Sequence, residues 1–187
     1  MRLAEPLERG AIYLRDLTAA DATQRYLAWL SDPEVSRYLE VRFAPTHTQE
    51  RLASFIDDCN TNANVLLLGI ILKQDDRHIG NIKLGPIDWN HLTGEIGLLI
   101  GDRSQWGKGY ARLAISLVSD YAFENLKLCK LTAGCYAGNE GSARAFAGAG
   151  FLFEGRRLLQ WVVDGRRQDG LLLGKVNASI VSGEKGE

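Results

Sequence analysis

The segment Trp106-Gly107-Lys108-Gly109-Tyr110-Ala111 is the feature that most restricts how this chain can fold. The residues before it, 93–100, are strongly apolar after Glu95 and read as a strand, and 109–126 read as a long helix with an apolar stripe. The two glycines allow a tight turn and let an anion approach backbone N–H groups, because no Cβ intervenes. The helix start adds unpaired donors and the positive end of its dipole. The segment therefore predicts a phosphate or pyrophosphate site, with an ordinary glycine-containing turn as the alternative.

Two well-known phosphate-binding motifs do not fit this segment. A P-loop requires Gly-Lys followed by Ser or Thr, but Gly107-Lys108 is followed by Gly109, which has no hydroxyl for magnesium. A dinucleotide fingerprint requires a third glycine three positions after the second, where this chain has Arg112. A nucleotide-binding oxidoreductase is therefore disfavoured.

The remaining hydrophobic pattern describes a mixed α/β (α+β) domain. Further strands are expected at 12–14, 65–72, 78–84, 130–136, 155–163 and 168–176, the last two forming a hairpin around Asp164-Gly165. Further helices are expected from Thr18 as N-cap to about 30, and at 34–39, 49–59 and 140–149. This order of elements predicts one sheet in a single domain over residues 1–176, followed by a mobile tail, 177–187.

Composition narrows the class of protein. The 187 residues include 22 Lys plus Arg and 23 Asp plus Glu, a net charge of -1, without the basic excess typical of nucleic-acid binders. Cys59, Cys129 and Cys135 lack the density of a disulfide scaffold and the spacing of a zinc site, so we expect reduced thiols and no metal. The sequence contains neither a signal-peptide core nor an apolar run of about 20 residues. We expect a cytoplasmic protein with no nucleic-acid or membrane partner.

Several motifs resemble the GNAT acetyltransferases, specifically the branch containing the ribosomal-protein acetyltransferases RimJ and RimL. The acetyl-CoA loop of that family follows Arg/Gln-x-x-Gly-x-Gly/Ala; Gly109 and Ala111 match its last two defined positions, and Trp106 at the first looks typical of this branch. The other similar segments are Tyr13–Leu17, Trp29–Val35, Ile79–Ile82, and Asn139–Ser142 leading to Gly150-Phe151. The resemblance implies an acetyl-CoA-dependent N-acetyltransferase with a mixed, mostly antiparallel, twisted sheet of about six to seven strands flanked by helices.

The resemblance also implies where acetyl-CoA binds. Backbone N–H groups of the glycine-containing loop would hold the CoA pyrophosphate, and the preceding strand would offer backbone groups to the pantetheine arm and to the thioester carbonyl. The expected acetyl-CoA residues are Leu98, Leu99, Ile100, Trp106, Gly107, Lys108, Gly109, Tyr110, Ala111, Asn139, Ser142 and Phe146.

Two residues are candidates for proton transfer. Glu95 interrupts an apolar strand, so we expect partial burial, a raised pKa and a role as the base that accepts the amine proton; a structural hydrogen bond is the alternative. Many family members place a tyrosine acid where this chain has Phe146, which cannot donate a proton. Ser142 resembles the serine proposed as acid in RimL-like enzymes, the alternative being an ordinary first-turn serine. Asn139 is expected to cap this helix. Because of Phe146, a non-catalytic acyl-CoA sensor is the competing class.

The acceptor is left open by the sequence. Trp29, Arg37, Tyr38 and Arg42 lie in the helical region that, by resemblance, walls the acceptor cleft. This region looks similar to enzymes that acetylate amino sugars attached to nucleotides; a protein N-terminus is the near alternative, and a polyamine or aminoglycoside is less favoured. The histidines His47, His78 and His91 are expected to be polar surface residues. A homodimer joined through sheet edges or the C-terminal hairpin is compatible with the pattern.

Overall fold

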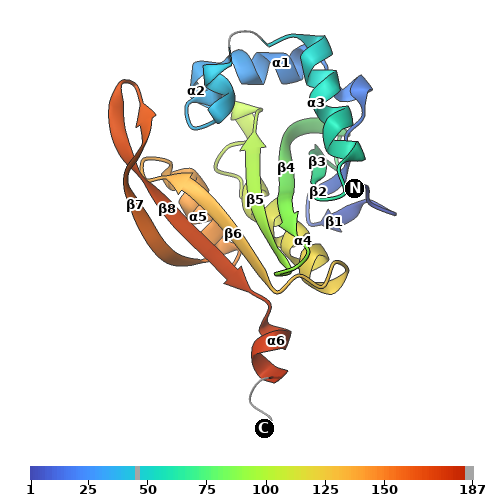
Figure 1. The fold of residues 1–187 in the computed structure, drawn as a ribbon. Helices are drawn as coiled ribbons and strands as arrows, with labels where there is room; N and C mark the ends of the chain where they lie inside the picture. The colour runs from blue at the N-terminus through green and yellow to red at the C-terminus, as the bar shows by residue number, and fades with distance from the viewer. Residues whose placement is uncertain (45–46, 184–187) are drawn as a thin grey trace.

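One sheet of eight strands organises the chain (Figure 1). The computed structural model describes residues 1–44 and 47–183. The strand order is β1-β2-β3-β4-β5-β6-β8-β7, and the pairing is antiparallel everywhere except between β5 and β6, which run parallel. The α+β class and the mixed, mostly antiparallel sheet are thus confirmed.

The elements have the following bounds. The strands are β1 (Leu7–Arg9), β2 (Ile12–Asp16), β3 (Leu66–Leu72), β4 (Arg77–Asp88), β5 (Thr93–Ile100), β6 (Lys130–Tyr136), β7 (Leu152–Val163) and β8 (Arg166–Val176). The helices are α1 (Gln24–Ser31), α2 (Pro33–Ser36), α3 (Gln49–Thr61), α4 (Tyr110–Glu124), α5 (Glu140–Gly148) and α6 (Ala178–Gly183), with 3₁₀ turns η1 (Ala19–Asp21), η2 (Glu40–Phe43) and η3 (Arg103–Gln105).

Three local features differ from the expectations. The unexpected strand is β1, whose three residues include Glu8 and Arg9 and so give no apolar alternation. Thr18 precedes η1 and does not cap α1; Thr23 does, its hydroxyl accepting a 3.3 Å hydrogen bond from the backbone N–H of Tyr26. The C-terminal segment from residue 177 begins with the helix α6, and residues 184–187 of the expected mobile tail lie outside the described residues.

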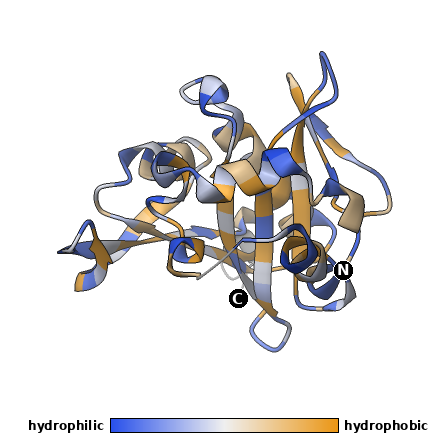
Figure 2. Ribbon diagram, turned by 90° about the horizontal axis from the view of Figure 1, so that it is seen from above, coloured by the Kyte–Doolittle hydropathy of each residue, from blue (hydrophilic) through white to orange (hydrophobic). Residues whose placement is uncertain are grey.

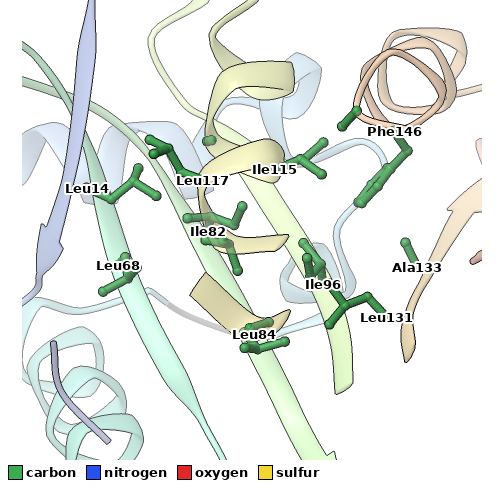
Figure 3. Close-up of a cluster of buried hydrophobic side chains, with 14 of the residues drawn as sticks. Leu14, Leu68, Ile82, Leu84, Ile96, Ile115, Leu117, Leu131, Ala133 and Phe146 are labelled. Carbon is green, nitrogen blue, oxygen red and sulfur yellow. The ribbon is translucent and has the colours of Figure 1, made fainter. Parts of the chain in front are cut away.

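One face of the sheet holds the main core, because alternate side chains along each strand point to the same side. Leu68, Ile82, Ile96 and Leu131 point toward α4 and α5, where Ile115 and Phe146 meet them (Figure 3). Seen from above, hydrophobic colouring concentrates on these central elements, and hydrophilic colouring on the outlying loops (Figure 2). This core fixes the start of α4 and the start of α5 beside β5 and β6.

Helices α1 and α3 cover the opposite face over β3, where Tyr26, Leu52 and Ile56 pack around Leu67. Toward β5 this face carries Asn81, Lys83 and Gly97, since Lys83 lies opposite Gly97 in the register of β4 and β5, and Asn81 two residues away. Polar and very small side chains replace the apolar layer here. The sheet is therefore left with a hollow over β4, β5 and β6.

Candidate active site

Strands β5 and β6 pair only at their first residues and then separate. Their parallel register covers Thr93–Glu95 against Lys130–Thr132, whereas β5 continues to Ile100 along β4, and β6 continues to Tyr136 along β8. Beyond Glu95 the edge of β5 that faces β6 therefore has no partner strand. Backbone N–H and C=O groups on such an edge can bind an extended ligand as a strand would. Of the expected residues here, Leu98 and Leu99 line the adjoining cavity, described below.

The glycine-containing loop lies just beyond the end of β5. Gly107 and Gly109 have φ angles of +75° and +81°, a conformation that L side chains rarely adopt, and a Cβ at either would meet no atom within 4 Å. The glycines are thus required by the backbone turn and leave the outer side of the loop open. The Trp106 indole Nε1 donates a 2.7 Å hydrogen bond to the carbonyl of Ile100, which ties the loop to the strand.

Helix α4 begins with unpaired donors at this loop. Gly109 is its N-cap and offers no side-chain acceptor, and the first intrahelical bond runs from the backbone N–H of Leu113 to the carbonyl of Gly109, at 3.1 Å. The N–H groups of Tyr110, Ala111 and Arg112 precede that bond, so they are available to an anion at the positive end of the helix dipole. Lys108 is exposed, and its Nζ donates to the Gln105 side chain at 3.0 Å.

A cavity of about 710 Å³ occupies the hollow of the sheet and reaches into the split between β5 and β6. Its floor comes from β4, β5 and β6, one wall from α3, another from α5, and its cover from the segment that contains η2. The lining residues with chemical groups of interest are Tyr26, Tyr38, Glu40, His47, Arg51, Asn81, Lys83, Glu95, Tyr136, Asn139, Ser142 and Trp161. The size of the cavity suits a small-molecule ligand.

Glu95 is the last residue of β5 that pairs with β6, so its carboxylate stands where the split opens. It lines the cavity but is exposed, and the expected partial burial is therefore wrong. The physical reason is the register: Glu95 lies on the face where Lys83 and Gly97 leave the hollow, and no apolar layer covers it.

Helix α5 brings Asn139 and Ser142 to the cavity. The side-chain Oδ1 of Asn139 accepts a 3.1 Å hydrogen bond from the backbone N–H of Ser142, so Asn139 caps the helix as expected. Ser142 is half-buried and lines the cavity. Phe146, one turn further, also touches the cavity but is 1% exposed and packs edge-to-face on Phe151 at 5.0 Å. Its ring belongs chiefly to the core.

The cover of the cavity is fastened across the split. The Tyr136 hydroxyl donates a 2.6 Å hydrogen bond to Oε1 of Glu40 and accepts one of 2.9 Å from Nη2 of Arg42. Burial and the hydrogen bond to Glu40 raise the pKa of the Tyr136 hydroxyl. On one side of Tyr136 lies Tyr38, at 5.4 Å between ring centroids, and on the other Trp161, at 4.4 Å. These contacts join the N-terminal helical half of the chain to β6 and β7.

The expected acceptor residues divide into three groups. Tyr38 lines the cavity, and its hydroxyl donates to the carbonyl of Gly138 at 3.0 Å. Arg37 and Arg42 are not among the lining residues and instead hold the cover in place: Arg37 pairs with Asp164 at 2.7 Å, and Arg42 also donates to the carbonyl of Val162 at 2.8 Å. Trp29 is 6% exposed in the core beneath α1 and lies outside the lining.

His78 differs from its expected surface position. Its ring packs against Trp29 at 5.0 Å between centroids, and burial lowers its pKa. Its Nε2 lies 2.9 Å from the carbonyl of Gly80 and 2.8 Å from Oδ1 of Asn81, two acceptors, so this nitrogen carries the proton. His47 is half-buried at the cavity, and His91 is exposed.

The sequence interpretation missed Glu40, Lys83 and Tyr136 as residues of the site. Lys83 had a detectable signal, because its place two residues after Asn81 puts both side chains on one face of a predicted strand. Glu40 and Tyr136 had none, since 96 positions separate them and only the tertiary fold brings them into contact.

The sheet splits beside a helix start that has free N–H donors, and a carboxylate lies where the strands separate. These features are those of a transferase that binds an acyl carrier through backbone groups of the protein. Residues 11–152 match the model of the acetyltransferase (GNAT) domain, and the chain belongs to this family of N-acetyltransferases that use acetyl-CoA. Its branch is the RimJ/RimL-like one. Of the described helices, none is long and apolar enough to cross a membrane.

Individual relatives agree with this assignment. An uncharacterised N-acetyltransferase of Bacillus licheniformis, p20, is 30% identical over 152 residues, which span 81% of this chain and 84% of p20. The spermidine N-acetyltransferase of Vibrio cholerae, solved with CoA and spermine, superposes with a TM-score of 0.81 at 21% identity, over 92% of this chain and 99% of that one. The ribosomal-protein-S5-alanine acetyltransferase of Vibrio fischeri gives a TM-score of 0.74 at 20% identity, over 93% and 97%. At these identities the two structures show the shared fold.

Proposed function

We propose that the chain acetylates the primary amine of an amino-sugar nucleotide, with the acetyl donor bound in the β5–β6 split and the acceptor in the cavity. The observation that carries the proposal is the separation of β5 from β6 at Glu95, because it places one carboxylate between the two binding regions. The free edge at Leu98–Ile100 would hold the pantetheine arm, and the first-turn N–H groups of α4 would hold the pyrophosphate.

The reaction then needs three contributions from the chain. Glu95 accepts the proton of the attacking amine, directly or through water. A backbone N–H of β5 polarises the thioester carbonyl while the new N–C bond forms and the C–S bond breaks. Ser142 or water donates a proton to the departing thiolate, because the buried Phe146 carries no acidic group.

The charges of the cavity favour an acceptor that carries an anionic group as well as an amine. The lining includes the carboxylates of Glu40 and Glu95 and, from β4 and from α3 with the residues before it, the basic side chains of Lys83, Arg51 and His47. Lys83 forms no ion pair within the described chain, so its charge is available to a phosphate. A polyamine would instead bring several positive charges toward these cations.

The aromatic side chains of the cavity add a second argument for this acceptor. Tyr38 and Trp161 line the cavity beside the buried Tyr136, whose ring packs against both. Flat aromatic surfaces of this kind pack well on a sugar ring or a nucleobase. An amino-sugar nucleotide offers both, together with the amine and the phosphates.

The test is calorimetric titration with acetyl-CoA, followed by a thiol-release assay with matched acceptors. The panel pairs UDP-linked amino sugars with the same sugars lacking the nucleotide, and adds spermidine and N-terminal peptides. We expect acetyl-CoA to bind and turnover to be fastest with a nucleotide-linked sugar. Faster turnover of spermidine or of a peptide would contradict the proposed acceptor. Binding of acetyl-CoA without turnover of any amine would favour a non-catalytic sensor. Failure to bind acetyl-CoA would contradict the proposed site.

A further inference from the structure

A polar side chain is buried in the floor of the cavity without a complete set of hydrogen bonds. Asn81 lies on β4, is 5% exposed and lines the cavity. Among the residues that the structure describes, none accepts a hydrogen bond from its amide nitrogen, Nδ2. Buried polar groups are nearly always hydrogen-bonded in folded proteins, and an unpaired one costs free energy. An unpaired donor at a ligand cavity therefore indicates a partner that arrives with the ligand.

The neighbouring His78 fixes which way the Asn81 amide faces. The His78 Nε2 atom lies 2.8 Å from Asn81 Oδ1 and 2.9 Å from the carbonyl of Gly80. A carbonyl can only accept, so Nε2 carries the proton, and the Asn81 atom that meets it is also an acceptor. The oxygen of the amide is thus turned toward His78, and Nδ2 is turned away from it.

The Tyr26 hydroxyl is a second polar group at this place. Tyr26 comes from α1, is 5% exposed, lines the cavity and packs its ring against Trp29 and His78 at 5.6 and 5.8 Å between centroids. Burial, and then the Cys59 thiol, raise the pKa of this hydroxyl, while the Asn81 amide lowers it, so the two polar groups are neighbours. No hydrogen bond from Nδ2 joins them, and both can turn to a common third atom.

Two neutral donors at one place suit an uncharged oxygen atom. The N–H of Asn81 and the O–H of Tyr26 can both donate to one hydroxyl or carbonyl oxygen, which has two lone pairs. A protonated polyamine presents only N–H groups, so it would leave the Asn81 amide unpaired. Sites of this kind discriminate strongly, because a ligand without the matching group leaves buried polar atoms without a partner.

We propose that Asn81 and Tyr26 are specificity-determining residues, whose side chains bind a hydroxyl or carbonyl oxygen of the acceptor. The inference rests on the proposed function in taking the cavity as the acceptor site. The strand register sets Asn81 opposite Leu99, four residues or about 13 Å along β5 from Glu95. The oxygen therefore belongs to a part of the acceptor that is remote from its reactive amine.

Asn81→Leu tests the inference, because leucine keeps the branched shape of the side chain without a polar atom, and His78 keeps its contact with the Gly80 carbonyl. The binding of a UDP-linked amino sugar is measured by calorimetry in the presence of CoA, so that no turnover is needed. We expect a Kd about 10-fold above that of the wild type, with acetyl-CoA affinity unchanged. The free energy of unfolding in urea should stay the same or rise, since an unpaired buried donor has been removed.

A second variant and a matched control accompany this test. Tyr26→Phe removes the hydroxyl without adding bulk and should also weaken the binding of the amino sugar. The control is Asn64→Leu, because Asn64 accepts a 2.9 Å hydrogen bond from the Trp89 indole and is not among the lining residues. It should leave the affinity for the amino sugar unchanged.

The outcomes separate this inference from the choice of acceptor. A loss of stability in Asn81→Leu with an unchanged Kd would overturn the inference, because the amide would then serve the fold alone. So would a wild type that binds spermidine more tightly than every oxygen-bearing amine tested. If the wild type binds an N-terminal peptide in place of the sugar nucleotide, and Asn81→Leu weakens that binding, the amino-sugar assignment is wrong and the inference stands, since a peptide also offers carbonyl oxygens.

Discussion

Tyr136 and Glu40 form a 2.6 Å hydrogen bond across the split of the sheet, although 96 positions separate them in the chain. Arg42 donates to the same hydroxyl at 2.9 Å, so one phenol oxygen holds both charged residues of η2. Hydrogen bonds that involve charged groups each contribute about 1.5–3 kcal/mol. This oxygen is therefore the main fastening point of the cavity's cover.

Replacement of Tyr136 by Phe tests this fastening. The ring and its stacking on Trp161 stay, but Glu40 and Arg42 lose their common partner. We expect faster amide hydrogen exchange over 37–44, and an acceptor KM raised about 10-fold, as a loss of about 1.4 kcal/mol would produce. Tyr13→Phe is the control, because it removes a 3.1 Å bond between β2 and Asp76 in the β3–β4 turn, and neither residue lines the cavity. Unchanged exchange in Tyr136→Phe would show that other contacts hold the cover.

Replacement of Gly109 by Trp tests the loop. A side chain at φ +81° costs about 1–2 kcal/mol of stability, and the indole would fill the open side where an anion would bind. Gly165, in the β7–β8 turn, has φ +75° and equally open surroundings, so Gly165→Trp carries similar strain away from the loop. We expect similar losses in thermal stability but a loss of acetyl-CoA affinity, measured by calorimetry, only in Gly109→Trp. Equal affinities would exclude the loop from the binding site.

Strands β5 and β6 show which parts of the fold can be predicted from the sequence. The sequence predicts strands at 93–100 and 130–136 with the bounds that β5 and β6 have, because the spacing of apolar residues is a local signal. That these strands pair over only three residues is a property of their register in the sheet, and no local pattern encodes it. The split, and with it the exposure of Glu95, could therefore not be derived from the residues alone.

Trp29 illustrates a second limit. An aromatic residue on an amphipathic helix fits a core as well as a cleft wall, and the periodicity is the same for both. In the structure Trp29 packs on His78 and against Gly101, where a Cβ would overlap its ring. Contacts with residues more than 40 positions away place Trp29 in the core instead of at the cleft wall. The sequence alone could not distinguish these two positions, and so could not test the expected role in acceptor binding.

Ser142 can be tested without disturbing its helix, because the cap uses its backbone N–H and not its hydroxyl. We expect Ser142→Ala to lower kcat while the unfolding free energy stays close to that of the wild type. Asn139→Ala, which removes the cap, should instead cost about 1 kcal/mol of stability in urea titrations. If Ser142→Ala keeps full kcat, water supplies the proton to the leaving thiolate.

Glu95→Gln should lower kcat by about 10²- to 10⁴-fold, since the amide keeps the shape of the side chain but cannot accept the amine proton. Acetyl-CoA affinity should be unchanged, because the proposed contacts to the donor come from the backbone of β5 and from α4. Glu124→Gln at the end of α4 is the matched control and should keep both values. A normal rate in Glu95→Gln would assign the base to another group.

His78 gives a prediction about stability and pH. Burial lowers its pKa below the ordinary 6.5, so between these two values the unfolded chain binds a proton that the folded chain does not. Its contribution to stability is therefore complete above pH 6.5 and is lost as the pH falls through the folded-state pKa. His78→Gln keeps an N–H donor for Asn81 but does not titrate. The free energy of unfolding in urea, measured at about pH 7.5 and about pH 5.5, should therefore fall less between these pH values in the variant than in the wild type. Equal losses in the two proteins would mean that the carboxylates, and not this histidine, set the acid sensitivity of the fold.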